Sequence, residues 1–293
     1  MNYRHHFHAG NFADVVKHVL LLGLLQNLRR KATPFCYIDT HAGVGLYDLG
    51  AGAAQRTLEF KSGLGRLKAV TAAKVPAWVA DYQKAVAALQ AERAGFWYPG
   101  SPWLALHHLR PQDRALLLEL HPEDAGLLKQ YFSRHPQLAI HERDAYEGLV
   151  ALVPPKEKRG LVLIDPPYEE ERDDYAPVVE LLLKAHAKWP TGVYALWFPI
   201  KDYAVIKRFY RRLRNTGLPR MLATELCVLP PDNSLGLNGS GLVIVNPPWQ
   251  FDVTARAVLQ WLQPVLSDHP QAQCNVEWLA GEAPAGKAGA AEE

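Results

Sequence analysis

The chain contains little cysteine: only 3 of its 293 residues are cysteines, at positions 36, 227 and 274. They are far apart and include no Cys-x-x-Cys pair, which argues against a disulfide framework and against a cysteine-based zinc site. Three histidines stand close together at positions 5, 6 and 8, but no adjacent acid or cysteine completes a metal site. We therefore expect a protein that holds no metal ion.

Long apolar runs are also absent. The longest, Val19–Leu25, is far shorter than the ~18 residues that cross a membrane, and residues 1–10 lack the apolar core of a signal peptide. We expect a cytoplasmic protein without membrane contact, and a monomer. The formal net charge is only +2, so a surface that binds nucleic acid must be a local basic patch. Basic residues gather at 29–31 and along a helix expected at 202–216, where we favour a solvated helix face and keep a surface that binds nucleic acid as the alternative.

The most informative segment is residues 161–168, Leu-Val-Leu-Ile-Asp-Pro-Pro-Tyr. The apolar residues predict a short strand buried on both faces, and two prolines cannot continue a β-ladder, so the chain must leave the sheet at Asp165. The prolines stiffen the backbone and thereby fix the directions of the Asp165 carboxylate, the Pro166 carbonyl and the Tyr168 ring. In open α/β sheets, ligands bind at the carboxyl ends of the strands. We expect a reaction site here, with a plain strand-to-loop turn as the alternative.

A second copy of this pattern, Asn246-Pro247-Pro248-Trp249, follows the apolar residues 242–245. On the motif alone it competes with Asp165 for the same role. Its strand is the last one expected, which should lie toward an edge of a doubly wound sheet, whereas Asp165 follows a strand next to the point where the sheet reverses direction. We therefore expect the second copy to be structural.

Residues 34–45 predict a strand that ends in an acid and is followed by Gly43 and Gly45. Glycines let the backbone approach a ligand closely, but nicotinamide enzymes, flavin enzymes and plain turns share a Gly-x-Gly turn. No Gly-Lys-Ser or Gly-Lys-Thr follows, which excludes a nucleoside-triphosphate loop. A dinucleotide-binding unit would place its ribose-binding acid roughly 20 residues further on, yet the next strand that ends in an acid is residues 114–119. We infer that a segment is inserted between them.

Acids end four successive expected strands, at Asp39, Glu119, Asp144 and Asp165. Glu119 could accept hydrogen bonds from both hydroxyls of a ribose, and Asp144 could accept from the amine of an adenine. Each acid alone could simply cap the start of a helix. Four in succession favour a cofactor site at one edge of the sheet.

The alternation of apolar and polar segments predicts an α/β protein with a seven-stranded, mostly parallel sheet. A helix that Asn11 caps should run to Arg29 and pack against this sheet. We expect residues 46–98 to form an inserted helical subdomain, residues 1–45 and 99–280 to form the main domain, and the Ala/Gly-rich tail 281–293 to be disordered. The expected strands lie near residues 35–39, 115–120, 138–142, 161–164, 193–198, 222–229 and 242–245.

Asp165-Pro166-Pro167-Tyr168 resembles the catalytic motif of methyltransferases that modify an exocyclic amine of a nucleobase. Other segments extend the resemblance along almost the whole chain: the start Tyr3–Asn11, then Val16–His18, Asp39–Gly43, Tyr98–Pro102 and the Asn-Pro-Pro-Trp copy. Together they make the chain similar to the RlmJ family, bacterial methyltransferases that act on an adenine of 23S ribosomal RNA.

The resemblance implies a Rossmann-like class I fold that uses S-adenosyl-L-methionine to methylate the N(6) amine of an adenine in 23S ribosomal RNA. Asp165 and the Pro166 carbonyl would accept hydrogen bonds from the amine, and Tyr168 would stack on the base. Tyr3 and Arg4 would join Tyr168 in contacting the RNA. Cofactor contacts would fall on His18, His41, Gly43, Ser101, Glu119, Asp144, Ala145 and Asp165.

Two alternatives remain, which are the same chemistry on DNA and a catalytically idle RNA-binding protein that keeps the fold. A DNA enzyme would usually carry a separate target-recognition region, and the inserted segment is too Ala-rich and too weakly basic to suggest one. An idle protein should have lost an acid or a glycine of the site, and the sequence shows no such loss.

Overall fold

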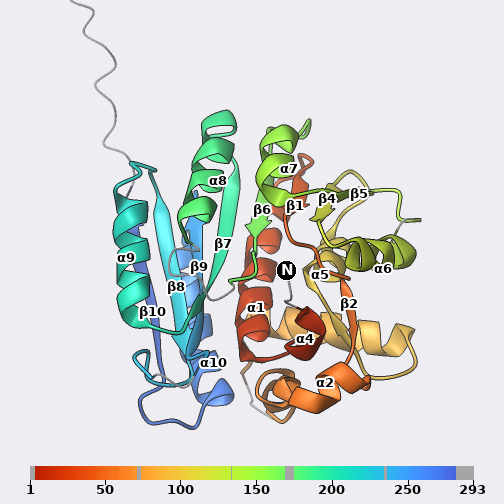
Figure 1. Ribbon diagram of the computed structural model, residues 1–293, viewed down its shortest axis with the longest axis vertical. Helices are drawn as coiled ribbons and strands as arrows, with labels where there is room; N and C mark the ends of the chain where they lie inside the picture. The colour runs from red at the N-terminus through yellow and green to blue at the C-terminus, as the bar shows by residue number, and fades with distance from the viewer. Residues whose placement is uncertain (1–3, 71–73, 133, 169–174, 234–235, 282–293) are drawn as a thin grey trace, which may run out of the picture.

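An eight-stranded sheet, in the spatial order β10-β8-β9-β7-β6-β1-β4-β5, forms the centre of the protein (Figure 1). The computed structural model describes residues 4–70, 74–132, 134–168, 175–233 and 236–281. The strands of the sheet are β1 (Cys36–Asp39), β4 (Arg114–Glu119), β5 (Leu138–Glu142), β6 (Gly160–Ile164), β7 (Val193–Ile200), β8 (Met221–Cys227), β9 (Gly239–Val245) and β10 (Gln273–Ala280).

The strands that carry the predicted acids are parallel neighbours. β5, β4, β1, β6 and β7 pair in parallel, whereas β9 runs antiparallel to both β7 and β8. After β1 the chain continues to β4 and β5 on one side and then returns to β6 and β7 on the other. The order in which strands are added therefore reverses between β1 and β6. The register pairs Asp39 with both Leu117 and Leu163, which brings the carboxyl ends of these strands to one edge. The mostly parallel α/β architecture is confirmed.

The sheet has one strand more than the seven expected. β10 pairs antiparallel with β8, from Gln273 opposite Cys227 to Ala280 opposite Met221. It lies at the edge of the sheet and only Val276 and Leu279 are buried, so it has no continuous apolar run that could have indicated it. The predicted disorder of the tail concerns residues that, after Gly281, lie outside the described part of the chain.

Helices cover both faces of the sheet. α1 (Phe12–Arg29), α5 (Ser101–His108) and α10 (Phe251–Leu266) share one apolar cluster with the first face, and α7 (Ala145–Leu152), α8 (Tyr175–Lys188) and α9 (Tyr203–Arg214) share another with the second. β1 supplies both clusters, because successive side chains of a strand point to opposite faces: Tyr37 joins the first cluster and Ile38 the second. α6 (Pro122–Phe132) packs against β4 and β5. Within the described ranges, no helix combines the length and apolarity needed to cross a bilayer.

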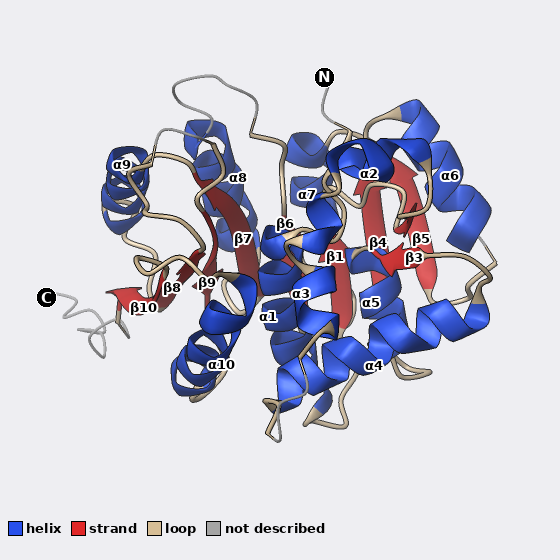
Figure 2. Cartoon of the chain, turned by 90° about the horizontal axis from the view of Figure 1, so that it is seen from below, coloured by secondary structure: helices blue, strands red, loops and turns tan. Residues whose placement is uncertain are grey.

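The segment between β1 and β4 contains mostly helices. Before α5 it includes β2 (Leu46–Asp48), α2 (Gly52–Thr57), α3 (Leu64–Lys68), α4 (Ala77–Glu92) and β3 (Trp97–Pro99). β2 and β3 pair antiparallel with each other. α4 packs against α1, and its buried side chains belong to the same apolar cluster (Figure 2). The division into a main domain and an inserted subdomain stays a prediction.

Candidate active site

A cavity of about 320 Å³ lies where β1, β4 and β6 end, beside the first turns of α1. This volume is in the range of small-molecule and cofactor pockets. The lining comes from the start of the chain, the loop after β1, the end of β4 and the turn after β6. Among the residues predicted for the site, it includes His18, His41, Gly43, Ser101, Glu119, Asp165, Pro166 and Tyr168.

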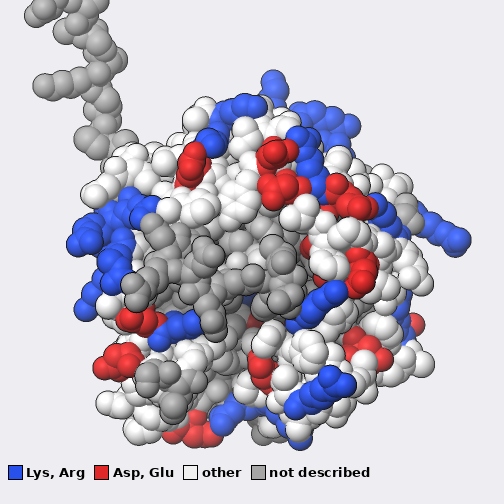
Figure 3. Space-filling view, in the orientation of Figure 1, with Lys and Arg blue, Asp and Glu red and all other residues white. Residues whose placement is uncertain are grey.

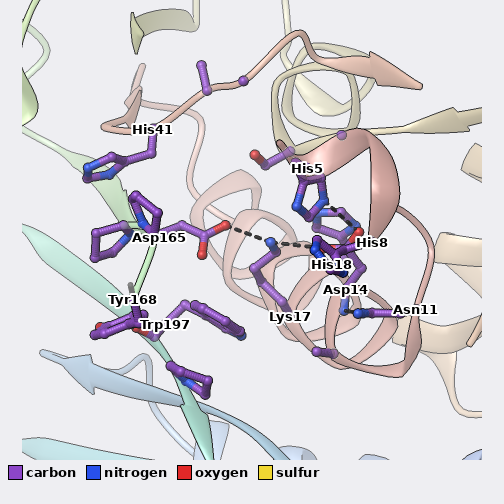
Figure 4. Close-up of a pocket in the computed structure, with 18 of the residues that line it drawn as sticks. His5, His8, Asn11, Asp14, Lys17, His18, His41, Asp165, Tyr168 and Trp197 are labelled. Atoms are coloured by element: carbon purple, nitrogen blue, oxygen red, sulfur yellow. Dashed lines mark hydrogen bonds and ion pairs between the residues drawn. The ribbon is translucent and has the colours of Figure 1, made fainter. Parts of the chain in front are cut away.

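Asp165 shares a buried cation with a second carboxylate (Figure 4). Its Oδ2 accepts a hydrogen bond of 2.6 Å from Nζ of Lys17, and the same Nζ lies 2.9 Å from Oδ1 of Asp14. Burial lowers the pKa of Lys17, but its attraction to Asp14 and Asp165 outweighs burial and raises the pKa overall. Lys17 therefore stays charged and holds one oxygen of Asp165. Within the described part of the chain, no group donates a hydrogen bond to the other oxygen, Oδ1.

Lys17 and Asp14 were not predicted as site residues. Asp14 also accepts a hydrogen bond from the backbone N–H of Gly10, and its Oδ2 lies 2.9 Å from Nε2 of His5. This corrects the expectation that the first histidines lack a nearby acid. Burial raises the pKa of Asp14, but His5 and Lys17 together hold it well below the usual range. The available signal was the presence of two charged residues, Asp14 and Lys17, among the apolar residues of the first turns of α1.

The loop after β1 brings backbone close to the cavity. Gly43 and Gly45 have φ values of +57° and +74°, in the left-handed region that favours glycine, and a Cβ on Gly43 would lie 2.5 Å from the hydroxyl of Tyr47. The N–H of Gly43 donates to Oε2 of Glu119 at 2.8 Å, and the N–H of His121 donates to Oε1 at 2.8 Å. Each oxygen keeps a further lone pair, so Glu119 can still accept two hydroxyl groups.

Two neutral histidines face the cavity. Nδ1 of His18 lies 2.9 Å from the hydroxyl of Tyr98, and burial lowers the pKa of His18 to about 3. Nδ1 of His41 lies 2.7 Å from Oγ1 of Thr40, and burial lowers the pKa of His41 to about 4. At neutral pH each ring therefore offers one donor and one acceptor.

The remaining predicted cofactor residues differ in their position. Ser101 lines the cavity, and its hydroxyl donates a hydrogen bond of 2.7 Å to Oδ2 of Asp39. Burial raises the pKa of Asp39 to about 6. Asp144 and Ala145 are not part of the lining; Oδ1 of Asp144 instead caps α7 by accepting from two backbone N–H groups of its first turn. Their contact with a cofactor stays a prediction.

The predicted RNA contacts are also placed differently. Tyr168 lines the cavity, its hydroxyl donates to the carbonyl of Trp197 at 2.7 Å, and its ring lies 4.9 Å from that of Tyr175. Arg4 is outside the lining and forms ion pairs at 2.8 Å with Glu123 and at 3.4 Å with Asp124, at the start of α6. Tyr3 lies outside the described residues.

The second Pro-Pro-aromatic copy lies at the opposite end of the parallel strands from the cavity, near their amino ends. The expectation that its strand lies toward the sheet edge is wrong, because β9 lies between β7 and β8. Since β9 runs antiparallel, Val245 pairs with Tyr194 near the start of β7, away from the carboxyl end of β6. Nδ2 of Asn246 donates to the carbonyls of Pro190 and Gly192, both at 2.8 Å. These contacts are structural and lie far from the cavity lining.

Sequence comparison identifies the family. The family model described as "Ribosomal RNA large subunit methyltransferase D, RlmJ" matches residues 32–280, most of the chain. The chain belongs to this family. Two curated relatives in the RlmJ family are both named ribosomal RNA large subunit methyltransferase J. The Haemophilus influenzae protein is 40% identical over 96% of this chain and 100% of its own length, and the Escherichia coli protein is 39% identical over the same shares.

Solved structures agree with the fold. The protein LPL1258 of Legionella pneumophila superposes with a TM-score of 0.82 at 33% identity, over 92% of this chain and 98% of its own. A probable spermidine synthase from Corynebacterium glutamicum reaches a TM-score of 0.51 at 13% identity, over 92% of this chain and 76% of its own. The second likeness shows the fold alone.

Proposed function

We propose that this chain transfers a methyl group from S-adenosyl-L-methionine to the exocyclic N(6) amine of an adenine in 23S ribosomal RNA. The curated relatives carry the name of a large-subunit ribosomal RNA methyltransferase, which supports the substrate class. The geometry of Asp165 is the observation that supports an adenine amine as the group that receives the methyl. Lys17 holds one of its oxygens, and the other can accept from a ligand beside the Tyr168 ring.

The lining fits a nucleoside-containing methyl donor. Gly43 has no side chain to fill the loop, and the free lone pairs of Glu119 suit the two hydroxyls of a ribose. S-adenosyl-L-methionine, when bound, supplies a methyl group that its sulfonium sulfur makes transferable. The lining residues that would hold it are His18, His41, Gly43, Ser101, Glu119 and Asp165. Asp144 and Ala145, which lie outside the lining, would join them only through the predicted contact with the adenine of the cofactor.

The amine of adenine is a poor nucleophile, because its lone pair is delocalised into the ring. Asp165 and the Pro166 carbonyl would accept hydrogen bonds from the two amine protons. These bonds favour the tetrahedral, more positive nitrogen of the transition state over the planar ground state. The gain is electrostatic, so the amine need not lose a proton before it attacks the methyl group.

The target adenine must leave its stack to reach Asp165. Extruding a base costs a few kcal/mol. Stacking on the Tyr168 ring would return roughly 1–3 kcal/mol of that. Several contacts hold the ring in place: its hydroxyl donates to the carbonyl of Trp197, and it lies beside the rings of Tyr175 and Trp197.

Methyl transfer from labelled S-adenosyl-L-methionine to unmodified, protein-free 23S RNA tests the proposal, with double-stranded and single-stranded DNA as controls. We expect label in N(6)-methyladenosine from RNA alone, identified by the mass of the nucleoside. Label in DNA would instead support the DNA alternative. Cofactor binding without any label in nucleic acid would support the idle binder.

A further inference from the structure

Three buried side chains form a hydrogen-bonded chain from α4 to the cavity. The hydroxyl of Tyr82, in α4, lies 3.0 Å from the hydroxyl of Tyr98, in β3. The Tyr98 hydroxyl lies 2.9 Å from Nδ1 of His18, in α1. Both tyrosines are 0% exposed and His18 is 1% exposed. Of the three, only His18 lines the cavity.

The number of available protons determines which group donates in each of these hydrogen bonds. Among the described residues, Tyr98 is the only hydrogen-bond partner of the Tyr82 hydroxyl. If Nδ1 of His18 donated to Tyr98, one of the two hydroxyl protons would be buried without an acceptor: that of Tyr82 if Tyr98 donated to Tyr82, or that of Tyr98 if it accepted from both neighbours. A buried donor without an acceptor is destabilising. In the other direction Tyr82 donates to Tyr98 and Tyr98 donates to Nδ1, so every hydroxyl proton has an acceptor.

The protonation state of His18 agrees with this direction. Burial lowers its pKa to about 3; Asp14 acts to raise the pKa, whereas Lys17 and His5 lower it further. A neutral ring whose Nδ1 accepts a hydrogen bond carries its one proton on Nε2. Nε2 has no hydrogen-bond partner among the described residues, and the ring forms part of the cavity wall.

We propose that Tyr98, supported by Tyr82, is a positioning residue that fixes His18 as the neutral Nε2–H tautomer and thereby gives the cavity a hydrogen-bond donor. This inference rests on the proposed function, because the matching acceptor is an oxygen of the bound methyl donor. The carboxylate of its amino-acid part has the right chemistry, whereas its ammonium group is a donor and does not. Both tyrosines lie outside the cavity lining, so they would support cofactor binding only through His18.

Nitrogen NMR of the full-length protein with 15N-labelled histidine rings tests the tautomer directly, with the His18 signals identified by their loss in His18→Gln. We expect an unprotonated Nδ1 and a protonated Nε2 at His18, without cofactor. Tyr98→Phe should change this pattern and weaken S-adenosyl-L-methionine binding about tenfold, the effect of one lost hydrogen bond. It should also raise the pH at which His18 takes up a proton, because the hydrogen bond from Tyr98 stabilises the neutral ring. Tyr82→Phe should have a smaller effect, since Tyr98 can still donate.

Tyr194→Phe is the matched control. Tyr194 is also 0% exposed, and its hydroxyl donates to the carbonyls of Ala185 and Trp189 on the other face of the sheet. It should leave the His18 tautomer and cofactor affinity unchanged. A wild-type spectrum with the proton on Nδ1, or a Tyr98→Phe protein with unchanged tautomer and affinity, would overturn the proposal. A wild-type protein with the expected tautomer but no cofactor binding would contradict the proposed function and still support the positioning role.

Discussion

Lys17 is a buried positive charge that two carboxylates share. Its side chain is 6% exposed, and it connects Asp14 in the first turn of α1 with Asp165 after β6. The bond to Asp165 fixes the orientation of the carboxylate, so its second oxygen can point to a substrate without first rearranging. A preorganised acceptor of this kind stabilises charge that develops on an attacking amine.

Lys17→Met should therefore impair both folding and catalysis. Removing one partner of a buried ion pair leaves the other charges uncompensated, and we expect the free energy of unfolding to fall by roughly 3 kcal/mol. Methyl transfer should slow by about 100-fold, because Asp165 loses its fixed orientation. Denaturant unfolding and initial rates measure the two effects. Lys184→Met is the control: it removes an exposed ion pair with Glu180 on α8 and should leave stability and rate unchanged. Wild-type stability and rate in Lys17→Met would refute the role of the Lys17–Asp165 ion pair.

The sequence was informative about residues at strand ends and uninformative about Lys17. Asp165 and Glu119 could be predicted because each directly follows an apolar run that marks a strand. The Lys17–Asp165 bond joins residues 148 positions apart, and no local pattern shows which buried acid a helical lysine will meet. For the same reason Asp144, which looks equivalent to the other acids in the sequence, caps α7 outside the cavity lining.

At the scale of elements, local signals predicted helix ends better than strand partners. α1 begins after Asn11, whose side chain accepts from the N–H of Asp14 at 3.0 Å, and it ends at Arg29, as predicted. The direction and neighbours of β9 and β10 depend on contacts between distant segments, and these two strands account for the differences from the expected sheet. The direction of β9 decides which of the two Pro-Pro-aromatic turns can take part in the reaction.

Asn246→Ala should accordingly reduce stability and leave catalysis intact. The substitution removes two hydrogen bonds, to Pro190 and Gly192, and places alanine at a φ of +56°. We expect a loss of about 2 kcal/mol in the free energy of unfolding, with an unchanged methyl-transfer rate. Asn246→Gly lacks the same hydrogen bonds but adopts positive φ easily, so it should lose less. A large fall in the rate of folded Asn246→Ala would mean that this turn takes part in the reaction.

At the scale of the whole molecule, charge is uneven although the net charge is small. Figure 3 shows lysine and arginine side chains gathered along α9, whose opposite side is buried through Ile206, Phe209 and Leu213. A protein of net charge +2 that binds RNA would need a local basic surface, and α9 is one candidate for it.

The most direct test of the account compares N(6)-methyladenosine formation by the wild type and Asp165→Asn. Asparagine keeps the shape of the side chain and one acceptor oxygen but removes the negative charge that stabilises the attacking amine. We predict that Asp165→Asn, folded and still able to bind S-adenosyl-L-methionine, forms N(6)-methyladenosine in 23S RNA about 100-fold or more slowly than the wild type. Formation at the wild-type rate would contradict the assignment of Asp165 as the catalytic carboxylate that accepts a hydrogen bond from the amine.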